Sequence, residues 1–325
     1  MTPGSTGAPA VDRAPRAGPG ARRLLVIVNP GARNGAAPVD AALDVLRAKG
    51  LEVVREHCAP GRTVSDAIRA HDPAGLAGVV VGGGDGTMNA AAPALVETGL
   101  PLGILPLGTA NDLARTLGIA PDPVAAAEVI AAGRLRRIDL GEVNGRPFFN
   151  VASVGFSADL ARSLRTDLKR RWGTLGYAIA AAQLLRRARP FSVEIDHDGV
   201  SERLRAIQVS VGNGRHYGGG MTVHWDAEPD DGTLDLYAIE VTHWWRVIAL
   251  LPALRSGTYD RWRDVRGLHT TECLVHTRRP RPVNADGEIV TETPARFRVV
   301  PGAVQVFAPP PPIRPTAPLP PQDRP

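Results

Sequence analysis

Residues 78–87 read Gly78-Val79-Val80-Val81-Gly82-Gly83-Gly84-Asp85-Gly86-Thr87, an apolar run followed by a glycine-rich turn. The apolar run predicts a buried strand, and the pattern at 88–96 predicts a helix that begins at the turn. A turn between a strand and a helix directs backbone N–H groups and the positive end of the helix dipole at one point, where a phosphate can bind. The stretch therefore predicts an α/β fold with a phosphate site at the end of a strand.

Two further loops follow apolar runs in the same part of the chain. Pro106-Leu107-Gly108-Thr109-Ala110-Asn111-Asp112 follows the run at 101–105, and Asn29-Pro30-Gly31 follows the run at 24–28. Helix-like segments at 39–49, 64–70 and 88–96 alternate with these runs. Such alternation predicts a parallel sheet covered on both faces, with ligands beyond the carboxyl ends of its strands. We therefore expect the three loops to meet at one edge of the sheet.

Asp85 is the one charged residue of the glycine-rich turn. A carboxylate beside a phosphate is unfavourable unless both share a cation, so this position favours Mg²⁺ bridging Asp85 and a nucleotide. In the alternative, the turn is structural and Asp85 caps the helix that starts near Thr87. In the second loop, Thr109 is suited to hydrogen-bond phosphate. Asn111 and Asp112 would fix that loop, help to hold the metal or cap the next helix.

The charged residues exclude one common way of binding phosphate. The 325 residues carry a net charge of +5, and of the 38 basic residues only Lys49 and Lys169 are lysines, the other 36 being arginines. The usual P-loop needs a lysine after its glycines, and neither lysine lies in a glycine-rich turn. The charge of a phosphate must therefore be met by backbone amides, a metal ion or arginine.

The remaining composition favours the cytoplasm. Cys58 and Cys273 lie far apart and form no CxxC motif, which fits a reducing compartment. No apolar run approaches the roughly 18 residues that span a bilayer. Residues 1–21 are rich in Ala, Gly, Pro and Arg, and residues 310–325 are rich in Pro. We expect a disordered leader and a disordered tail at these two ends.

The character of the chain changes after about residue 140. Asp198-Gly199 is typical of a hairpin turn, and helix-like stretches lie near 172–187 and 243–254. Runs typical of strands occur at 148–154, 191–197, 203–211, 234–240, 272–276, 297–300 and 304–307. We therefore expect two domains, a parallel α/β domain at 22–140 and an antiparallel β-sandwich at 141–309.

Together the motifs resemble those of a known family. The motifs that carry the resemblance are Gly83-Gly84-Asp85-Gly86-Thr87, the loop at 106–112, Asn29-Pro30 and the distal Asp286-Gly287-Glu288. They are similar to motifs of the diacylglycerol kinase catalytic family, in its branch of soluble bacterial lipid kinases related to sphingosine and ceramide kinases. The resemblance covers about residues 22–309. It implies a two-domain kinase, with an N-terminal ATP-binding domain and a C-terminal β-sandwich that carries the lipid substrate.

The resemblance also implies roles for individual residues. Asp85 is the most critical residue of the nucleotide loop, and Glu288 matches the base that removes the proton from the lipid hydroxyl. Without the resemblance, Asp286-Gly287 is interpreted as a hairpin turn that leaves Glu288 in solvent. The residues expected around Mg-ATP are Asn29, Pro30, Gly83, Gly84, Asp85, Gly86, Thr87, Met88, Asn89, Thr109, Asn111 and Asp112.

A second, structural Mg²⁺ is implied at 227–234. In the family one aspartate and two backbone carbonyls hold this ion, which corresponds here to Asp231 with the carbonyls of Glu228 and Thr233. From the residues alone, Asp-Asp-Gly is more typical of a turn before a strand. The chain departs from the family pattern in the first loop, where Ala32 and Arg33 replace serine and glycine, and at 57–60, which lacks a threonine to contact ATP.

The resemblance thus implies an ATP- and Mg²⁺-dependent lipid kinase, with diacylglycerol as the leading substrate. The alternatives are a kinase of a soluble acceptor such as NAD, and a nucleotide- or lipid-binding regulator without turnover. The stretch at 162–189 holds eight basic residues against one acid, Asp167. It would contact anionic lipid at the inner membrane face, or form a domain helix with solvated ends. Nucleic acid is not expected, because aromatic residues are few and no nucleic acid-binding motif occurs.

Overall fold

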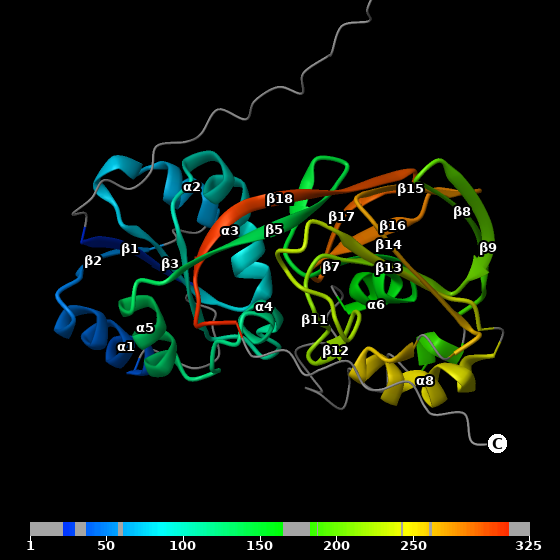
Figure 1. The fold of residues 1–325 in the computed structure, drawn as a ribbon, viewed down its shortest axis with the longest axis horizontal. Coiled ribbons are helices and arrows are strands. Elements are labelled where there is room, and N and C mark those ends of the chain that lie inside the picture. The colour runs from blue at the N-terminus through cyan, green and yellow to red at the C-terminus, as the bar shows by residue number, and fades with distance from the viewer. Residues whose placement is uncertain are drawn as a thin grey trace, which may run out of the picture.

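The computed structural model describes residues 22–29, 37–57, 61–164, 183–186, 188–241, 243–259 and 262–311, which form two lobes side by side (Figure 1). The expected leader at 1–21, Pro30, most of the basic stretch at 162–189 and nearly all of the tail at 310–325 lie outside these ranges. Arg33, where the first loop departs from the family pattern, lies outside them as well.

The first lobe is built on four parallel strands. In sheet order they are β2 (Glu52–His57), β1 (Arg23–Val28), β3 (Gly78–Gly83) and β4 (Leu102–Pro106). Helices α1 (Ala37–Ala48) and α5 (Pro123–Ala131) lie on one side of the sheet, and α2 (Val64–Arg69) and α3 (Asp85–Thr98) on the other (Figure 1). A 3₁₀ turn (Pro73–Gly75) and α4 (Asp112–Thr116) complete the lobe. Every residue of β3 and β4 is buried, as apolar strands of a doubly covered sheet should be.

One long strand, β18 (Ala295–Phe307), connects the two lobes (Figure 1). It pairs with β4 through Val306 and Leu102, and runs antiparallel to β5 (Leu135–Val143) and β15 (Glu272–Thr277). β5 also pairs with β6 (Arg146–Phe148), while β15 continues the sheet to β8 (Phe191–His197) and β9 (Val200–Ala206). Val304, Val306 and Phe307 lie in the hydrophobic core of the first lobe, so the end of the described chain returns to that lobe.

The second lobe is an antiparallel sandwich, which confirms the predicted fold class. Its second sheet has the order β14 (Val265–Thr270), β13 (Leu234–Ile239), β10 (Gln208–Gly212), β7 (Val151–Gly155), β16 (Pro282–Ala285) and β17 (Glu288–Glu292). Side chains from both sheets, among them Val193, Leu236 and Phe297, fill the space between them. Cys273 lies in this core, 1% exposed.

The outer face of the six-stranded sheet carries a third hydrophobic cluster. Strand residues alternate in direction, so Leu236 points into the sandwich and Tyr237 points outward. Helix α8 (Trp244–Ser256) and the short strands β11 (His216–Tyr217) and β12 (Met221–Thr222) cover this face. A further helix, α6 (Phe156–Leu164), follows β7 directly. The loops beside β11 and β12 reach the first lobe, where the site described below is formed.

Candidate active site

The turn between β3 and α3 forms the first wall of the site. Gly84 is the N-cap of α3, with extended backbone and no side-chain cap, so the N–H groups of Asp85 and Gly86 have no intrahelical acceptor, whereas that of Thr87 donates to the carbonyl of Gly84 (2.9 Å). Asp85 does not cap the helix; one carboxylate oxygen instead accepts a 3.0 Å hydrogen bond from the N–H of Leu113. A Cβ atom added to Gly83 would lie 2.4 Å from the hydroxyl of Thr87, so only glycine fits there.

The loop between β4 and α4 lies directly against this turn. A Cβ atom on Gly108 would lie 2.5 Å from the Cα atom of Gly84, so the two backbones touch. Asn111 has a left-handed backbone (φ 50°), and its side-chain amide accepts from the N–H of Gly108 (2.9 Å) and donates to its carbonyl (3.0 Å). Thr109 is exposed at the tip of this loop. Asn111 therefore fixes the loop, as one of its predicted roles requires.

The third predicted loop joins the same edge through Asn29. Its N–H donates to the carbonyl of Gly82 (2.9 Å), and its side-chain amide donates to the hydroxyl of Thr87 (3.1 Å). Thr87 is buried and Met88 lies in the core of the first lobe, 2% exposed, so both side chains point inward from the turn. The Oδ1 atom of Asn89 is buried and has no hydrogen-bond partner among the described residues.

Asp112 connects the two lobes. Its carboxylate is 4% exposed and accepts a 2.9 Å hydrogen bond from the N–H of Gly219, in the loop between β11 and β12. The other carboxylate oxygen is buried and finds no hydrogen-bond partner within the described part of the chain. Burial raises the pKa of Asp112 to about 6; the Gly219 hydrogen bond opposes this, and the nearby charge of Asp85 adds to it. Sequence reasoning did not find the contact with Gly219, because it depends on how the lobes pack.

The distal motif reaches the same place as a hairpin. Asp286 (φ 46°) and Gly287 (φ 93°) form the two-residue turn between β16 and β17, for which Asp-Gly is the favoured pair. The carboxylate of Asp286 accepts from the N–H groups of Phe149 (2.7 Å), Asn150 (3.1 Å) and Val151 (3.1 Å). Asp286 was expected from the sequence only as a turn residue, and its side chain also fixes the backbone before β7.

The hairpin that holds the buried Asp286 also positions Glu288, two residues further along the chain. Burial raises the pKa of Asp286 to about 7; the N–H groups of Val151 and Phe149 lower it, and the charge of Asp85 raises it again. The hairpin tip therefore reaches the first lobe, since Asp286 binds the N–H of Phe149, whose side chain lies in the core of that lobe. Glu288, the first residue of β17, is exposed and pairs in register with Ala285. The structure thus contains both the predicted hairpin turn and an accessible Glu288 carboxylate next to it.

These residues fit a magnesium ion and the phosphates of a nucleotide. Asp85 lies near enough to Asp112 and Asp286 to raise the pKa of both, so a cation would relieve the repulsion between them. Carboxylate oxygens are the ligands that Mg²⁺ prefers, and Asp112 has a buried oxygen without a hydrogen-bond partner among the described residues. The contact of Gly84 with Gly108 leaves no room for side chains between the two loops. Asp85 and Asp112 are the residues that would hold the ion.

The segment predicted to hold a second Mg²⁺ forms a tightly bound turn. The exposed Asp231 accepts hydrogen bonds from the N–H (2.9 Å) and hydroxyl (2.8 Å) of Thr233. The carboxylate of Glu228 forms ion pairs with Arg215 (2.8 Å) and Arg136 (3.3 Å). These contacts agree with the turn before a strand that the Asp-Asp-Gly residues alone predicted. An ion held by Asp231 and the two carbonyls stays a prediction.

Asp139 anchors this segment to both lobes, and sequence analysis did not single it out. Its carboxylate accepts from the N–H groups of Gly232 (2.8 Å) and Gly302 (2.6 Å), and its own N–H donates to the carbonyl of Pro229 (2.7 Å). Asp139 is 4% exposed. A lone aspartate in a strand-like run gives no sequence signal for such a role.

The fold and the site define a two-domain kinase, a phosphotransferase with an alcohol as acceptor. Residues 23–143 match the family model "Diacylglycerol kinase catalytic domain", and residues 150–308 match "YegS C-terminal NAD kinase beta sandwich-like domain". The chain is 32% identical over 298 residues to a diacylglycerol kinase of Mycobacterium tuberculosis (strain ATCC 25618 / H37Rv), an alignment that covers 88% of this chain and 95% of that protein. The chain belongs to the diacylglycerol kinase family, in its group with a YegS-type C-terminal domain.

Two more comparisons agree with this assignment. A protein of Pseudomonas savastanoi pv. phaseolicola named as a YegS-like lipid kinase is 34% identical over 259 residues, covering 76% of this chain and 80% of that protein. A crystal structure from Bacillus anthracis, described as a candidate diacylglycerol kinase, superposes with a TM-score of 0.75 at 25% identity, covering 89% of this chain and 98% of the other. The family implies ATP as donor and a lipid as substrate. Among the described residues, no helix is long and apolar enough to cross a membrane.

Proposed function

We propose that this protein transfers the γ-phosphoryl group of ATP, in the presence of Mg²⁺, to the hydroxyl of a membrane lipid, with diacylglycerol as the leading acceptor. The observation that carries the proposal is that the distal hairpin reaches the first lobe: the carboxylate of Asp286 accepts from the N–H of Phe149 (2.7 Å), whose side chain lies in that lobe's core, and the charge of Asp85 acts on it. We assign the glycine-rich turn to phosphate binding, and Glu288 follows the hairpin turn directly at the start of β17. Phosphoryl transfer needs little more than positioning, charge stabilisation and one group to accept the proton of the alcohol.

Each part of the site has a role in this reaction. The first turn of α3 and the Gly108 loop bind and orient the phosphates through backbone N–H groups. Asp85 and Asp112 hold Mg²⁺, which when bound offsets the negative charge on the transferred group. Asn111 and Asn29 keep the loops in place. Glu288 orients the lipid hydroxyl and accepts its proton.

The exposed face of α8 supports contact with the lipid surface that presents the substrate. Trp245, Ile248 and Leu251 recur at intervals of three along the helix and are 53%, 51% and 43% exposed. Arg255 in the last turn of the helix is exposed as well. A helix with an apolar face and basic residues beside it is typical of binding to anionic lipid. We place membrane contact here in addition to the predicted stretch at 162–189.

Transfer of ³²P from ATP tests the proposal directly. The purified full chain is incubated with Mg-ATP and, in separate mixed-micelle reactions, with diacylglycerol, phosphatidylglycerol, a sphingoid base or ceramide. A detergent-free reaction with NAD covers the soluble acceptor, which the name of the matched C-terminal domain makes worth including. We expect labelled lipid, strongest with diacylglycerol, and its loss in Asp85→Ala. Label on NAD alone would identify the protein as a kinase of a soluble acceptor. ATP binding by calorimetry without any labelled product would identify it as a nucleotide-binding regulator without turnover.

A further inference from the structure

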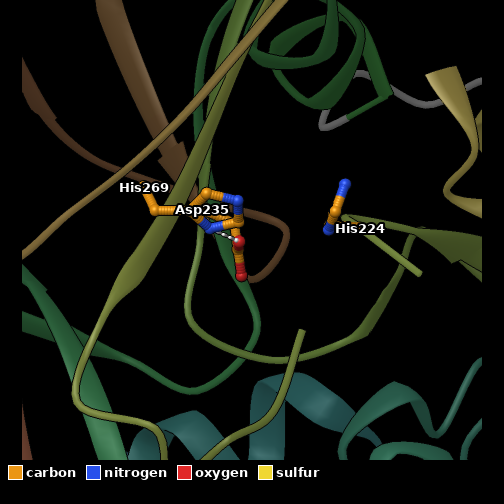
Figure 2. Close-up of side chains that lie close together, drawn as sticks. All are labelled: His224, Asp235 and His269. Atoms are coloured by element: carbon orange, nitrogen blue, oxygen red, sulfur yellow. Dashed lines mark ion pairs between the residues drawn. The ribbon is translucent and has the colours of Figure 1, made fainter. Parts of the chain in front are cut away.

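We propose that the outer face of the six-stranded sheet binds one divalent transition-metal ion of the zinc class between His224, Asp235 and His269. Each of these residues offers one ligand atom, and the three atoms lie within 4.8 Å of one another. Figure 2 shows Asp235 and His269 joined by an ion pair, with His224 on a separate segment to one side of them. This site is distinct from the carboxylates that we assign to the kinase reaction, and the inference does not depend on the proposed function.

The fold brings the three residues together from neighbouring elements. Asp235 on β13 and His269 on β14 are direct partners in the antiparallel register. Leu234 and Leu236 point into the sandwich core, so Asp235 between them points to the outer face. His224 follows β12 and packs edge-on against the ring of His269, with ring centroids 5.3 Å apart. Two of the three ligands are therefore held by a rigid sheet.

The burial of the group favours a bound cation. Asp235 is 4% exposed and His224 is 8% exposed, and a buried carboxylate is costly unless positive charge compensates it. The side chain of His269 is 55% exposed, which gives an ion a path from solvent to the buried ligands.

The set of donor atoms selects the kind of metal. Two imidazoles and one carboxylate suit zinc and similar ions, whereas Mg²⁺ prefers oxygen ligands and keeps several waters. The Nδ1 atom of His224 also pairs with the carboxylate of Asp226. A ligating histidine usually holds its second nitrogen against a carboxylate in this way, which orients the ring and raises its basicity. The chain thus supplies three ligands and a supporting contact, and leaves a fourth position for water.

Binding needs only small side-chain movements. Bonds of about 2.0–2.2 Å in a tetrahedral site place ligand atoms roughly 3.4 Å apart. The Nδ1 atom of His269 is now 2.7 Å from a carboxylate oxygen of Asp235, so that pair would open slightly while the third ligand moves closer. The ion would then tie the loop after β12 to β13 and β14. That loop leads into the segment around Glu228 and Asp231, which contacts both lobes.

Metal content and thermal unfolding test the inference without reference to activity. The full chain is stripped with a chelator, incubated with ZnCl₂ in excess MgCl₂, passed through gel filtration, and measured for zinc per chain and for melting temperature. We expect one zinc per chain, a raised melting temperature, and no competition by Mg²⁺. Co²⁺ in place of zinc should give the intense d–d bands of a tetrahedral site.

Variants distinguish this site from surface binding. His269→Ala removes an exposed ligand with little risk to the fold, and Asp226→Ala removes the supporting contact; we expect zinc affinity to fall at least 10-fold in each. The matched control is His276→Ala, since His276 also pairs with an aspartate, Asp196 (3.4 Å), but on β15. Wild-type protein that retains no zinc, or His269→Ala that binds zinc as tightly as His276→Ala, would overturn the inference and leave an ion-pair cluster in its place.

Discussion

The carboxylates of Asp85 and Asp286 lie close enough for the charge of Asp85 to raise the pKa of Asp286, although the first begins α3 and the second forms the turn between β16 and β17. Asp85 raises the pKa of Asp112 as well. Three carboxylates from three separate loops therefore concentrate negative charge beside a helix N-terminus. This arrangement suits a substrate that arrives with its own divalent cation, as a magnesium nucleotide does.

The raised pKa of Asp112 predicts how stability depends on pH. The folded protein holds this proton up to about pH 6, whereas the unfolded chain releases it near 3.8, so protonation stabilises the fold. The stabilisation is complete below pH 3.8 and is lost as the pH rises to about 6. Asp112→Asn cannot titrate and can still accept the Gly219 N–H. The free energy of unfolding of Asp112→Asn minus that of wild type should therefore increase by on the order of 1–3 kcal/mol from pH 4 to pH 7, because only wild type loses this stabilisation.

Urea unfolding of both proteins without Mg²⁺, at several pH values across this range, measures the difference. Other groups contribute equally to the two curves and cancel in the comparison. A difference that stays constant from pH 4 to pH 7 would show that Asp112 carries its charge throughout, and would remove the argument that this carboxylate needs a cation.

The sequence allowed the local features to be predicted better than the contacts between lobes. Buried apolar runs identified β1, β3 and β4, and the strand at 191–197 coincides with β8. β14, β16 and β17 were not predicted, because they are short and many of their residues are polar or only partly buried. The runs at 297–300 and 304–307 are one strand, β18, since a break in register between Val300 and Val304 interrupts its pattern without ending it.

The same distinction holds for the site. The glycine turns were recognisable because a left-handed backbone or a close approach requires particular residues locally, as at Asn111 and Gly108. Met88 was included with the phosphate-binding residues only because it lies within the turn, and the structure places its side chain in the core. The hydrogen bonds of Asp112 with Gly219 and of Asp286 with Phe149 could not be predicted, since they depend on strand pairing and lobe packing across more than a hundred residues.

Replacing Gly108 should separate the loops that follow β3 and β4. In Gly108→Ala the new methyl group would lie 2.5 Å from the Cα atom of Gly84 and 2.8 Å from Oδ1 of Asn111, so the backbone must move. We expect a loss of stability of about 1–3 kcal/mol and a fall in kcat/KM for ATP on the order of 100-fold. Gly75→Ala is the control, because a methyl group there meets no atom of the described residues within 4 Å. Equal kinase activity in the two variants would contradict the close contact of the loops.

Glu288→Gln should abolish proton transfer and leave nucleotide binding intact. The side chain is exposed, so its loss should not disturb folding, and removal of a general base typically lowers kcat by about 100- to 10,000-fold. ATP affinity, measured by calorimetry, should stay within about twofold of wild type. Glu292→Gln at the opposite end of β17 is the matched control, since Glu292 is also exposed. Lipid phosphorylation by Glu288→Gln at the rate of that control would require a different base.

The apolar face of α8 predicts a separation between membrane binding and catalysis. Trp245→Ala removes the largest exposed apolar side chain of the helix, 53% exposed, and should weaken sedimentation with vesicles of anionic phospholipid by about 10-fold. Phosphorylation of a short-chain, monomeric diacylglycerol should be unchanged, because α8 lies far from both α3 and β17 (Figure 1). Val200→Ser provides the comparison, since Val200 is 51% exposed but lies on β9, in the other sheet of the sandwich from the one that α8 covers. If both variants bind vesicles like wild type, α8 is not the lipid-contacting surface; if both lose binding equally, the effect is a general one of surface hydrophobicity. Loss confined to Trp245→Ala, with monomeric substrate still phosphorylated, would place the membrane at α8.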